Sequence, residues 1–132
     1  MDKYKVILVD DEAEVIDVIE QKIAWNELGF EVVGSATNGV KALELVEKTQ
    51  PDVVITDIKM PYMDGLELSK RLNDDYRNIH IIIFTGFDEF EYAKEAVHLE
   101  VEEYMLKPIN SDELTECLKR VKNSLDLERE EK

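Results

Sequence analysis

The sequence has one cysteine, few basic residues and no long hydrophobic run. The single cysteine, Cys117, excludes an intrachain disulfide, and its place in a helical pattern is typical of a small packed side chain rather than of a nucleophile. No apolar stretch is long enough to span a membrane, and the chain runs from Met1 to Tyr4 into a predicted strand with no signal-peptide pattern. Since a chain without disulfides suits a reducing compartment, we expect a cytoplasmic protein.

Basic residues are scarce relative to acidic ones. The chain has 16 Lys and Arg against 31 Asp and Glu, which gives a net charge of −15 at pH 7. Because binding to nucleic-acid phosphates needs clustered Lys and Arg, we exclude direct nucleic-acid binding by this segment. The length of 132 residues suits one domain, and a hydrophobic content of 44% is that of an ordinary globular chain.

Short hydrophobic segments alternate along the chain with segments of helical periodicity. Strand and helix repeat five times, which favours an α/β protein with a doubly wound parallel sheet. We expect the first helix to be closed by Trp25, Leu28 and Gly29, an acidic amphipathic helix over 87–99, and a last helix that begins at Asn110. The predicted strands are 4–9, 30–36, 52–56, 79–84 and 101–106.

Polar residues follow four of the predicted strands at the points where they end. Because the carboxyl ends of parallel strands lie at one edge of a sheet, where ligands bind, we expect these side chains to converge. Carboxylates, a hydroxyl and an ammonium group together suit a divalent cation and a phosphoryl group. Asp57 is the most informative of them, since a carboxylate can attack phosphorus and hold it as an acyl phosphate. The motifs are Asp10-Asp11-Glu12, Asp57 with Met60-Pro61 and Asp64-Gly65, Thr85-Gly86, and Lys107-Pro108.

These motifs, in this order, resemble those of the receiver domains of two-component response regulators. The resemblance extends from Tyr4 to about Leu125 and implies a flavodoxin-like (βα)5 receiver fold with the sheet order 2-1-3-4-5. It places a receiver domain over 1–125 and leaves a charged tail over 126–132, either a solvated helix end or the start of a linker to an output domain. Three segments are similar to receivers that precede AraC-type DNA-binding domains: 29–34, 55–58 and 87–93.

The resemblance implies that Asp57 is the phosphoacceptor. Asp11, Asp57 and the backbone carbonyl of Lys59 would bind Mg²⁺ directly, and Asp10 would act through water or by orienting its neighbour. Mg²⁺ takes hard oxygen ligands and keeps several waters, so one or two carboxylates are enough. Without the cation, three carboxylates at one place would repel one another and raise one or more pKa values. Glu12 also fits the preference for acidic residues at the start of a helix.

The resemblance also gives roles to residues that follow the later strands. Lys107 would pair with a phosphoryl oxygen, aimed by a cis peptide bond to Pro108, and Thr85 would donate a hydrogen bond to the same group. Tyr104 would turn inward when Thr85 moves. The residues two places after Asp57 and Thr85, which are Lys59 and Phe87, would tune loss of the phosphoryl group, and the bulk of Phe87 would hinder the attacking water.

The function implied by the resemblance is a phosphorylation-controlled switch rather than an enzyme, with phosphotransfer and autodephosphorylation as the only self-catalysed steps. A sensor histidine kinase would donate the phosphoryl group, and the face formed by residues 88–99, the fifth strand and the last helix would then change. That face would control homodimerisation and an output domain, expected to be a DNA-binding transcription regulator. The histidines of this chain, His80 and His98, have no part in this scheme.

Two other classes of protein stay open. An autonomous Mg²⁺-dependent phosphohydrolase similar to haloacid dehalogenases would place its nucleophilic Asp after the first strand and a second Asp two residues later. Here that second position holds Glu12, and the sequence has no visible cap domain. A stand-alone interaction module that is never phosphorylated is disfavoured by the intact set of Asp57, Thr85 and Lys107. Turnover of a generic phosphatase substrate would separate the phosphohydrolase from the switch.

Overall fold

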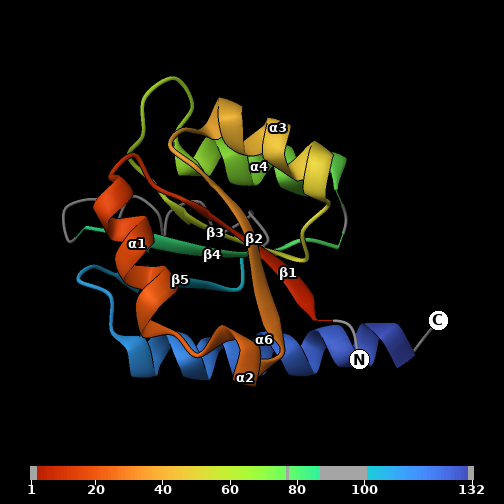
Figure 1. Ribbon diagram of the computed structural model, residues 1–132. Helices are drawn as coiled ribbons and strands as arrows, with labels where there is room; N and C mark the ends of the chain where they lie inside the picture. The colour runs from red at the N-terminus through yellow and green to blue at the C-terminus, as the bar shows by residue number, and fades with distance from the viewer. Residues whose placement is uncertain (1–2, 77, 87–100, 131–132) are drawn as a thin grey trace.

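The computed structural model describes residues 3–76, 78–86 and 101–130, in which a five-stranded sheet lies between two layers of helices (Figure 1). All the strand pairs are parallel, and the order is β2-β1-β3-β4-β5. The predicted fold class and sheet order are therefore confirmed. The strands are β1 (Tyr4–Val9), β2 (Phe30–Ala36), β3 (Val53–Asp57), β4 (His80–Thr85) and β5 (Glu103–Leu106).

Helices cover both faces of the sheet. In Figure 1, α3 and α4 lie together on one face, and α1, α2 and α6 lie on the other. The acidic helix predicted over 87–99 falls outside the described residues. The helices are α1 (Ala13–Lys22), α2 (Trp25–Leu28), α3 (Gly39–Thr49), α4 (Gly65–Asp75) and α6 (Ser111–Glu130).

The central strands are nearly continuous hydrophobic runs because both of their faces are buried. In β1, Val6 and Leu8 belong to the core beneath α1 and α6, whereas Ile7 and Val9 belong to the core beneath α3 and α4. This alternation follows from the two-residue period of a strand. A sheet covered on both sides therefore needs a nearly continuous apolar run, which is the pattern read from the sequence.

Several predicted boundaries differ from the structure. The first helix does not continue to Trp25, because Ile23 has extended backbone (φ −102°, ψ 135°) and turns its side chain into the core. Residues 25–28 form the separate short helix α2, which ends at Gly29 with φ 89°. The last strand begins at Glu103 rather than at residue 101, and β3 includes Asp57 as its final residue.

Helix α6 continues past Leu125, the end of the predicted domain, to Glu130. The hydroxyl of Tyr4 donates a hydrogen bond of 2.5 Å to Oδ1 of Asp126, and the guanidinium carbon of Arg129 lies 4.3 Å from the centre of the Tyr4 ring. Residues 126–130 are thus helical, and two of them, Asp126 and Arg129, contact Tyr4 of β1. Within the described ranges, no helix has both the length and the apolar character needed to cross a bilayer.

Candidate functional site

Four of the predicted site residues lie at the carboxyl end of the sheet. Asp57 and Thr85 are the last residues of β3 and β4. Asp10 directly follows β1, and Lys107 directly follows β5. Since β1, β3, β4 and β5 are successive in the sheet, their ends bring the charged side chains into contact. Nζ of Lys107 lies 3.0 Å from Oδ2 of Asp10 and 3.2 Å from Oδ2 of Asp57.

The two carboxyl groups at this edge are buried, with Asp10 3% exposed and Asp57 6% exposed. Burial raises the pKa of Asp57, and the negative charge of Asp11 adds to this effect, while the charge and hydrogen bond of Lys107 offset it only in part. Burial likewise raises the pKa of Asp10, against the opposing effect of a hydrogen bond from the backbone of Glu12. The edge therefore holds carboxylates that a further cation would stabilise.

Lys107 supplies the positive charge at this edge. Burial alone would lower the pKa of its ammonium group, but the hydrogen bond to Asp10 and the charges of Asp10 and Asp57 outweigh burial and raise it. The side chain therefore stays charged and lies between the two carboxylates. The peptide bond from Lys107 to Pro108 is cis, as the resemblance predicted.

The acidic residues after β1 can contribute to a metal site. Asp10, Asp11 and Glu12 each place one carboxylate oxygen within 4.8 Å of the others. Asp10 is held in position because its Oδ1 accepts a hydrogen bond of 2.9 Å from the backbone N–H of Glu12. Oxygen donors of this kind, beside the buried carboxylate of Asp57, fit Mg²⁺. The cluster contains Glu12 in addition to the predicted Asp10 and Asp11. The direct ligand roles of Asp11, Asp57 and Lys59 stay predictions.

The loop that follows Asp57, residues 58–64, is tied closely to that residue. The backbone N–H of Ile58 donates a hydrogen bond of 2.8 Å to Oδ1 of Asp57, and the N–H of Gly65 donates one of 2.7 Å to the carbonyl of Ile58. A Cβ atom at Gly65 would lie 2.1 Å from the carbonyl oxygen of Asp57, so only glycine fits there. Lys59 lies in this loop, two residues after Asp57.

The structure describes two of the three predicted switch and tuning residues on the later strands. The Thr85 hydroxyl is buried at the end of β4 and donates a hydrogen bond of 3.2 Å to the carbonyl of Gly86. Tyr104 lies half-buried on β5 opposite Ile83, and its hydroxyl oxygen is buried with no hydrogen-bond partner among the described residues. Burial raises the pKa of this phenol. Phe87 falls outside the described residues.

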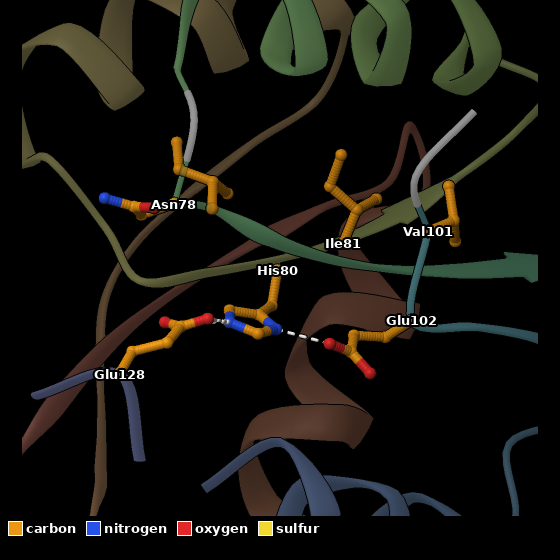
Figure 2. Close-up of a pocket in the computed structure, with 7 residues that line it drawn as sticks. Asn78, His80, Ile81, Val101, Glu102 and Glu128 are labelled. Atoms are coloured by element: carbon orange, nitrogen blue, oxygen red, sulfur yellow. Dashed lines mark hydrogen bonds and ion pairs between the residues drawn. The ribbon is translucent and has the colours of Figure 1, made fainter. Parts of the chain in front are cut away.

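A second polar group, which the sequence analysis did not find, lies at the amino end of β4 (Figure 2). Nδ1 of His80 is hydrogen-bonded to Oε1 of Glu102, and Nε2 lies 3.0 Å from Oε1 of Glu128. These residues line a cavity of about 280 Å³. No spacing rule could have found the group, because 48 positions separate His80 from Glu128. His80 begins β4 and Thr85 ends it, so this cavity and the carboxylate edge lie at opposite ends of the strand.

Comparison with known proteins assigns the family. The model of the response regulator receiver domain matches residues 6–119, and the chain belongs to this family. The chain is 43% identical over 118 residues to a Bacillus subtilis (strain 168) protein named uncharacterized transcriptional regulatory protein YesN, a match that covers 89% of this chain and 32% of that protein. It is 37% identical over 123 residues to the transcriptional regulatory protein HptR of Staphylococcus aureus (strain NCTC 8325 / PS 47), with 92% and 48% covered.

Solved structures give the same result. The receiver domain of AraT, a response regulator from Geobacillus stearothermophilus, superposes with a TM-score of 0.91 at 44% identity, covering 96% of this chain and 98% of that one. The two curated relatives are much longer, and this chain spans about a third of the length of one and about half of the length of the other. The protein is thus a receiver domain of a two-component response regulator, and relatives of its sequence are transcriptional regulatory proteins. Receiver domains in general are phosphoacceptor switches with an acidic Mg²⁺ pocket.

Proposed function

We propose that this receiver accepts a phosphoryl group on Asp57 from a sensor histidine kinase in a Mg²⁺-dependent reaction. The phosphorylated receiver then controls an output domain. The observation that supports this most strongly is the buried carboxylate of Asp57 at a strand end, with the Lys107 ammonium 3.2 Å away and the acidic group of Asp10 and Asp11 beside it. Membership of the receiver family favours this switch over an autonomous phosphohydrolase or an unphosphorylated interaction module.

The chemistry of transfer follows from the positions of these groups. A carboxylate oxygen of Asp57 attacks the phosphorus of phosphohistidine, the new O–P bond forms as the P–N bond breaks, and the electron pair stays on the imidazole of the kinase. Asp11, Asp57 and the carbonyl of Lys59 would hold Mg²⁺, with Asp10 acting through water, and the ion would supply charge neutralisation. Lys107 exchanges an aspartate oxygen for a phosphoryl oxygen and so stabilises the product.

The switch would involve the residues at the ends of β4 and β5. The Thr85 hydroxyl bonds the neighbouring carbonyl of Gly86 and must rotate to donate to a phosphoryl oxygen. Tyr104 would then move inward, and its buried hydroxyl, unpartnered among the described residues, is a group that such a movement can satisfy. The changed face, comprising residues 88–99, β5 and α6, would control homodimerisation and the output.

We propose that the output is a DNA-binding transcription regulator joined to the receiver. In this arrangement residues 1–125 are the receiver, and 126–132 begin the connection to the output domain. The curated relatives are transcriptional regulatory proteins about two to three times as long as the matched segment, which supports this organisation. This chain has 31 acidic and 16 basic residues, a charge balance that disfavours binding to DNA phosphates. We therefore assign DNA contact to the other domain.

The test is the intact mass of the protein after incubation with acetyl phosphate and Mg²⁺. We expect one added phosphoryl group in the wild type, and none in Asp57→Asn or when Mg²⁺ is removed by a chelator. Asp64→Asn, which alters a helix cap in the same loop, is the matched control and should still be phosphorylated. A folded wild type that gains no phosphoryl group would overturn the proposal. So would an Asp57→Asn variant that gains as much phosphoryl group as the wild type.

A further inference from the structure

The loop after Asp57, residues 58–64, is fastened to the amino end of α3. Gly39, the first residue of α3, donates a backbone hydrogen bond of 3.2 Å to the carbonyl oxygen of Met63. Met63 is 7% exposed, so this contact is largely protected from water. The preceding residue, Asn38, fixes this end of the helix, because its Oδ1 accepts a hydrogen bond of 2.9 Å from the N–H of Lys41.

There is no room for a side chain at Gly39. A Cβ atom at this position would lie 2.7 Å from Cβ, Cγ and the carbonyl oxygen of Met63. Rotation about χ1 can move Cγ of Met63 away, but its Cβ and its carbonyl oxygen are fixed to the backbone and move only with the loop. Gly39 is not in the left-handed region, so glycine is needed here for space and not for its backbone freedom.

The same loop carries backbone strain directly beside this contact. Tyr62 has φ 69°, and the N–H of Met63 bonds the carbonyl of Pro61 at 2.8 Å, which closes a γ-turn with positive φ. This form of turn is rare and strained, and it persists where the surroundings hold it. The Tyr62 side chain is 88% exposed, so its own packing supplies little of that restraint. The hydrogen bond from Gly39 to Met63 restrains the residue directly after Tyr62 and so helps to hold the turn.

We propose that Gly39 is a positioning residue for the metal site. By holding Met63 it fixes the loop that carries Lys59, and so sets the affinity of the acidic edge for Mg²⁺. This inference rests on the proposed function, in which the Lys59 carbonyl is a ligand. It adds a residue from another part of the chain, 18 positions before Asp57, to the strand-end motifs read from the sequence.

The test is a Mg²⁺ titration of Gly39→Ala, followed by the amide NMR signals of the acidic edge at a temperature where circular dichroism shows the variant folded. The matched control is Gly34→Ala, whose added Cβ would have the flexible side chain of Leu45 as its nearest neighbour, at 3.0 Å. We expect the dissociation constant for Mg²⁺ to rise by about tenfold in Gly39→Ala and to stay unchanged in Gly34→Ala.

A second measurement separates positioning from general stability. The Mg²⁺ concentration for half-maximal phosphorylation by acetyl phosphate should rise in Gly39→Ala, while the rate at saturating Mg²⁺ stays near that of the wild type. A folded Gly39→Ala with wild-type affinity would overturn the inference. If Gly39→Ala does not fold, Asn38→Ala replaces it as the test, because this substitution removes the cap of α3 but adds no clash. Its affinity for Mg²⁺ should also fall, and an unchanged affinity would overturn the inference.

The two proposals fail in different ways. If the wild type neither binds Mg²⁺ nor gains a phosphoryl group, the proposed function is wrong. If the wild type does both and the variants match it, only the role of Gly39 is wrong.

Discussion

Lys107 and Asp57 form an ion pair in which Nζ lies 3.2 Å from Oδ2, and the same ammonium group lies 3.0 Å from Asp10. One cation therefore pairs with two buried carboxylates, which lie at the carboxyl ends of β1 and β3. Because a buried charge is costly without a partner, we expect each member of this group to affect stability in addition to its proposed role in phosphorylation.

Removing the cation should destabilise the domain. In Lys107→Met the apolar stem is kept, but Asp10 and Asp57 are left as two unpaired carboxylates. We expect the free energy of unfolding at pH 7, without divalent ions, to fall by about 2 kcal/mol. Urea denaturation measures this change. In the control Lys119→Met, which breaks an exposed pair with Glu116, the change should be below about 0.5 kcal/mol, and equal losses would contradict the prediction.

Removing the charge of Asp57 should stabilise the metal-free domain. The pKa of this group in the folded state is raised above 3.8, so the folded protein holds the proton more tightly than the unfolded chain does. The resulting stability is fully present below pH 3.8 and is lost as the pH rises through the folded pKa. Asp57→Asn should therefore melt at a higher temperature than the wild type at pH 7.

Calorimetry across this pH range checks the sign. The difference in melting temperature between Asp57→Asn and the wild type should shrink toward zero below pH 3.8, where both side chains are neutral. Saturating Mg²⁺ should also reduce the difference at pH 7, since it stabilises a carboxylate that the variant lacks. A variant that melts below the wild type at pH 7 without Mg²⁺ would show that pairing with Lys107 outweighs burial.

The hydroxyl of Tyr4 should contribute to the stability of the end of α6. Burial, together with the hydrogen bond to Asp126, raises the pKa of this phenol to about 12. Tyr4→Phe keeps the ring beneath Arg129 and loses the bond, so we expect a loss of about 1 kcal/mol in denaturant titrations at pH 7. Tyr76→Phe, whose hydroxyl bonds Glu47 at an exposed site, should lose less.

The same phenol should make the wild type sensitive to alkali. Since the folded pKa of Tyr4 is about 12, above the ordinary 10.0, its contribution is complete below pH 10.0 and disappears as the pH rises through about 12. The stability advantage of the wild type over Tyr4→Phe should therefore shrink across this range. An advantage that stays constant up to pH 12 would rule out this linkage.

Cys117 should be unreactive in the folded protein. It is 2% exposed, and burial raises the pKa of its thiol to about 12, so the reactive thiolate is scarce at neutral pH. A chromogenic disulfide reagent should label the thiol only after urea unfolds the protein. Rapid stoichiometric labelling without urea would mean that α6 opens easily.

The lifetime of the phosphorylated state should depend on Phe87. If the bulk of this side chain hinders the attacking water, Phe87→Ala should lose its phosphoryl group faster than the wild type. A time course of intact mass after removal of the phosphodonor measures both rates. Much faster loss from the wild type than from the variant would contradict the prediction.

Much of the fold could be predicted because its signals are local. Each central strand contains a nearly continuous apolar run, and the polar residues at the strand ends must lie at the carboxyl edge once the strands are parallel. This places Asp57 and Lys107 at the same edge without any knowledge of contacts. The end of α1 differs from the prediction because helical spacing continues through Ile23, while burial in the core places that residue in extended backbone.

Contacts between elements could not be read in this way. The Gly39 to Met63 hydrogen bond and the approach of Glu128 to His80 each join residues from different elements, and neither leaves a periodic signal. An imidazole on a strand looks the same in sequence whether or not carboxylates face it. Glycine at the start of a helix likewise reads as a turn residue until the packing of the neighbouring loop is known.

The direction of α6 determines how far its carboxyl end lies from Asp57. The helix begins just after the cis bond at Lys107 and ends, 20 residues later, beside the first residues of β1 (Figure 1). At 1.5 Å per residue this is a length of roughly 30 Å. A segment attached after Glu130 would therefore start about a domain's width from Asp57 and out of its reach. A conformational effect of phosphorylation at Asp57 would therefore have to be transmitted through the receiver itself or between two copies of it.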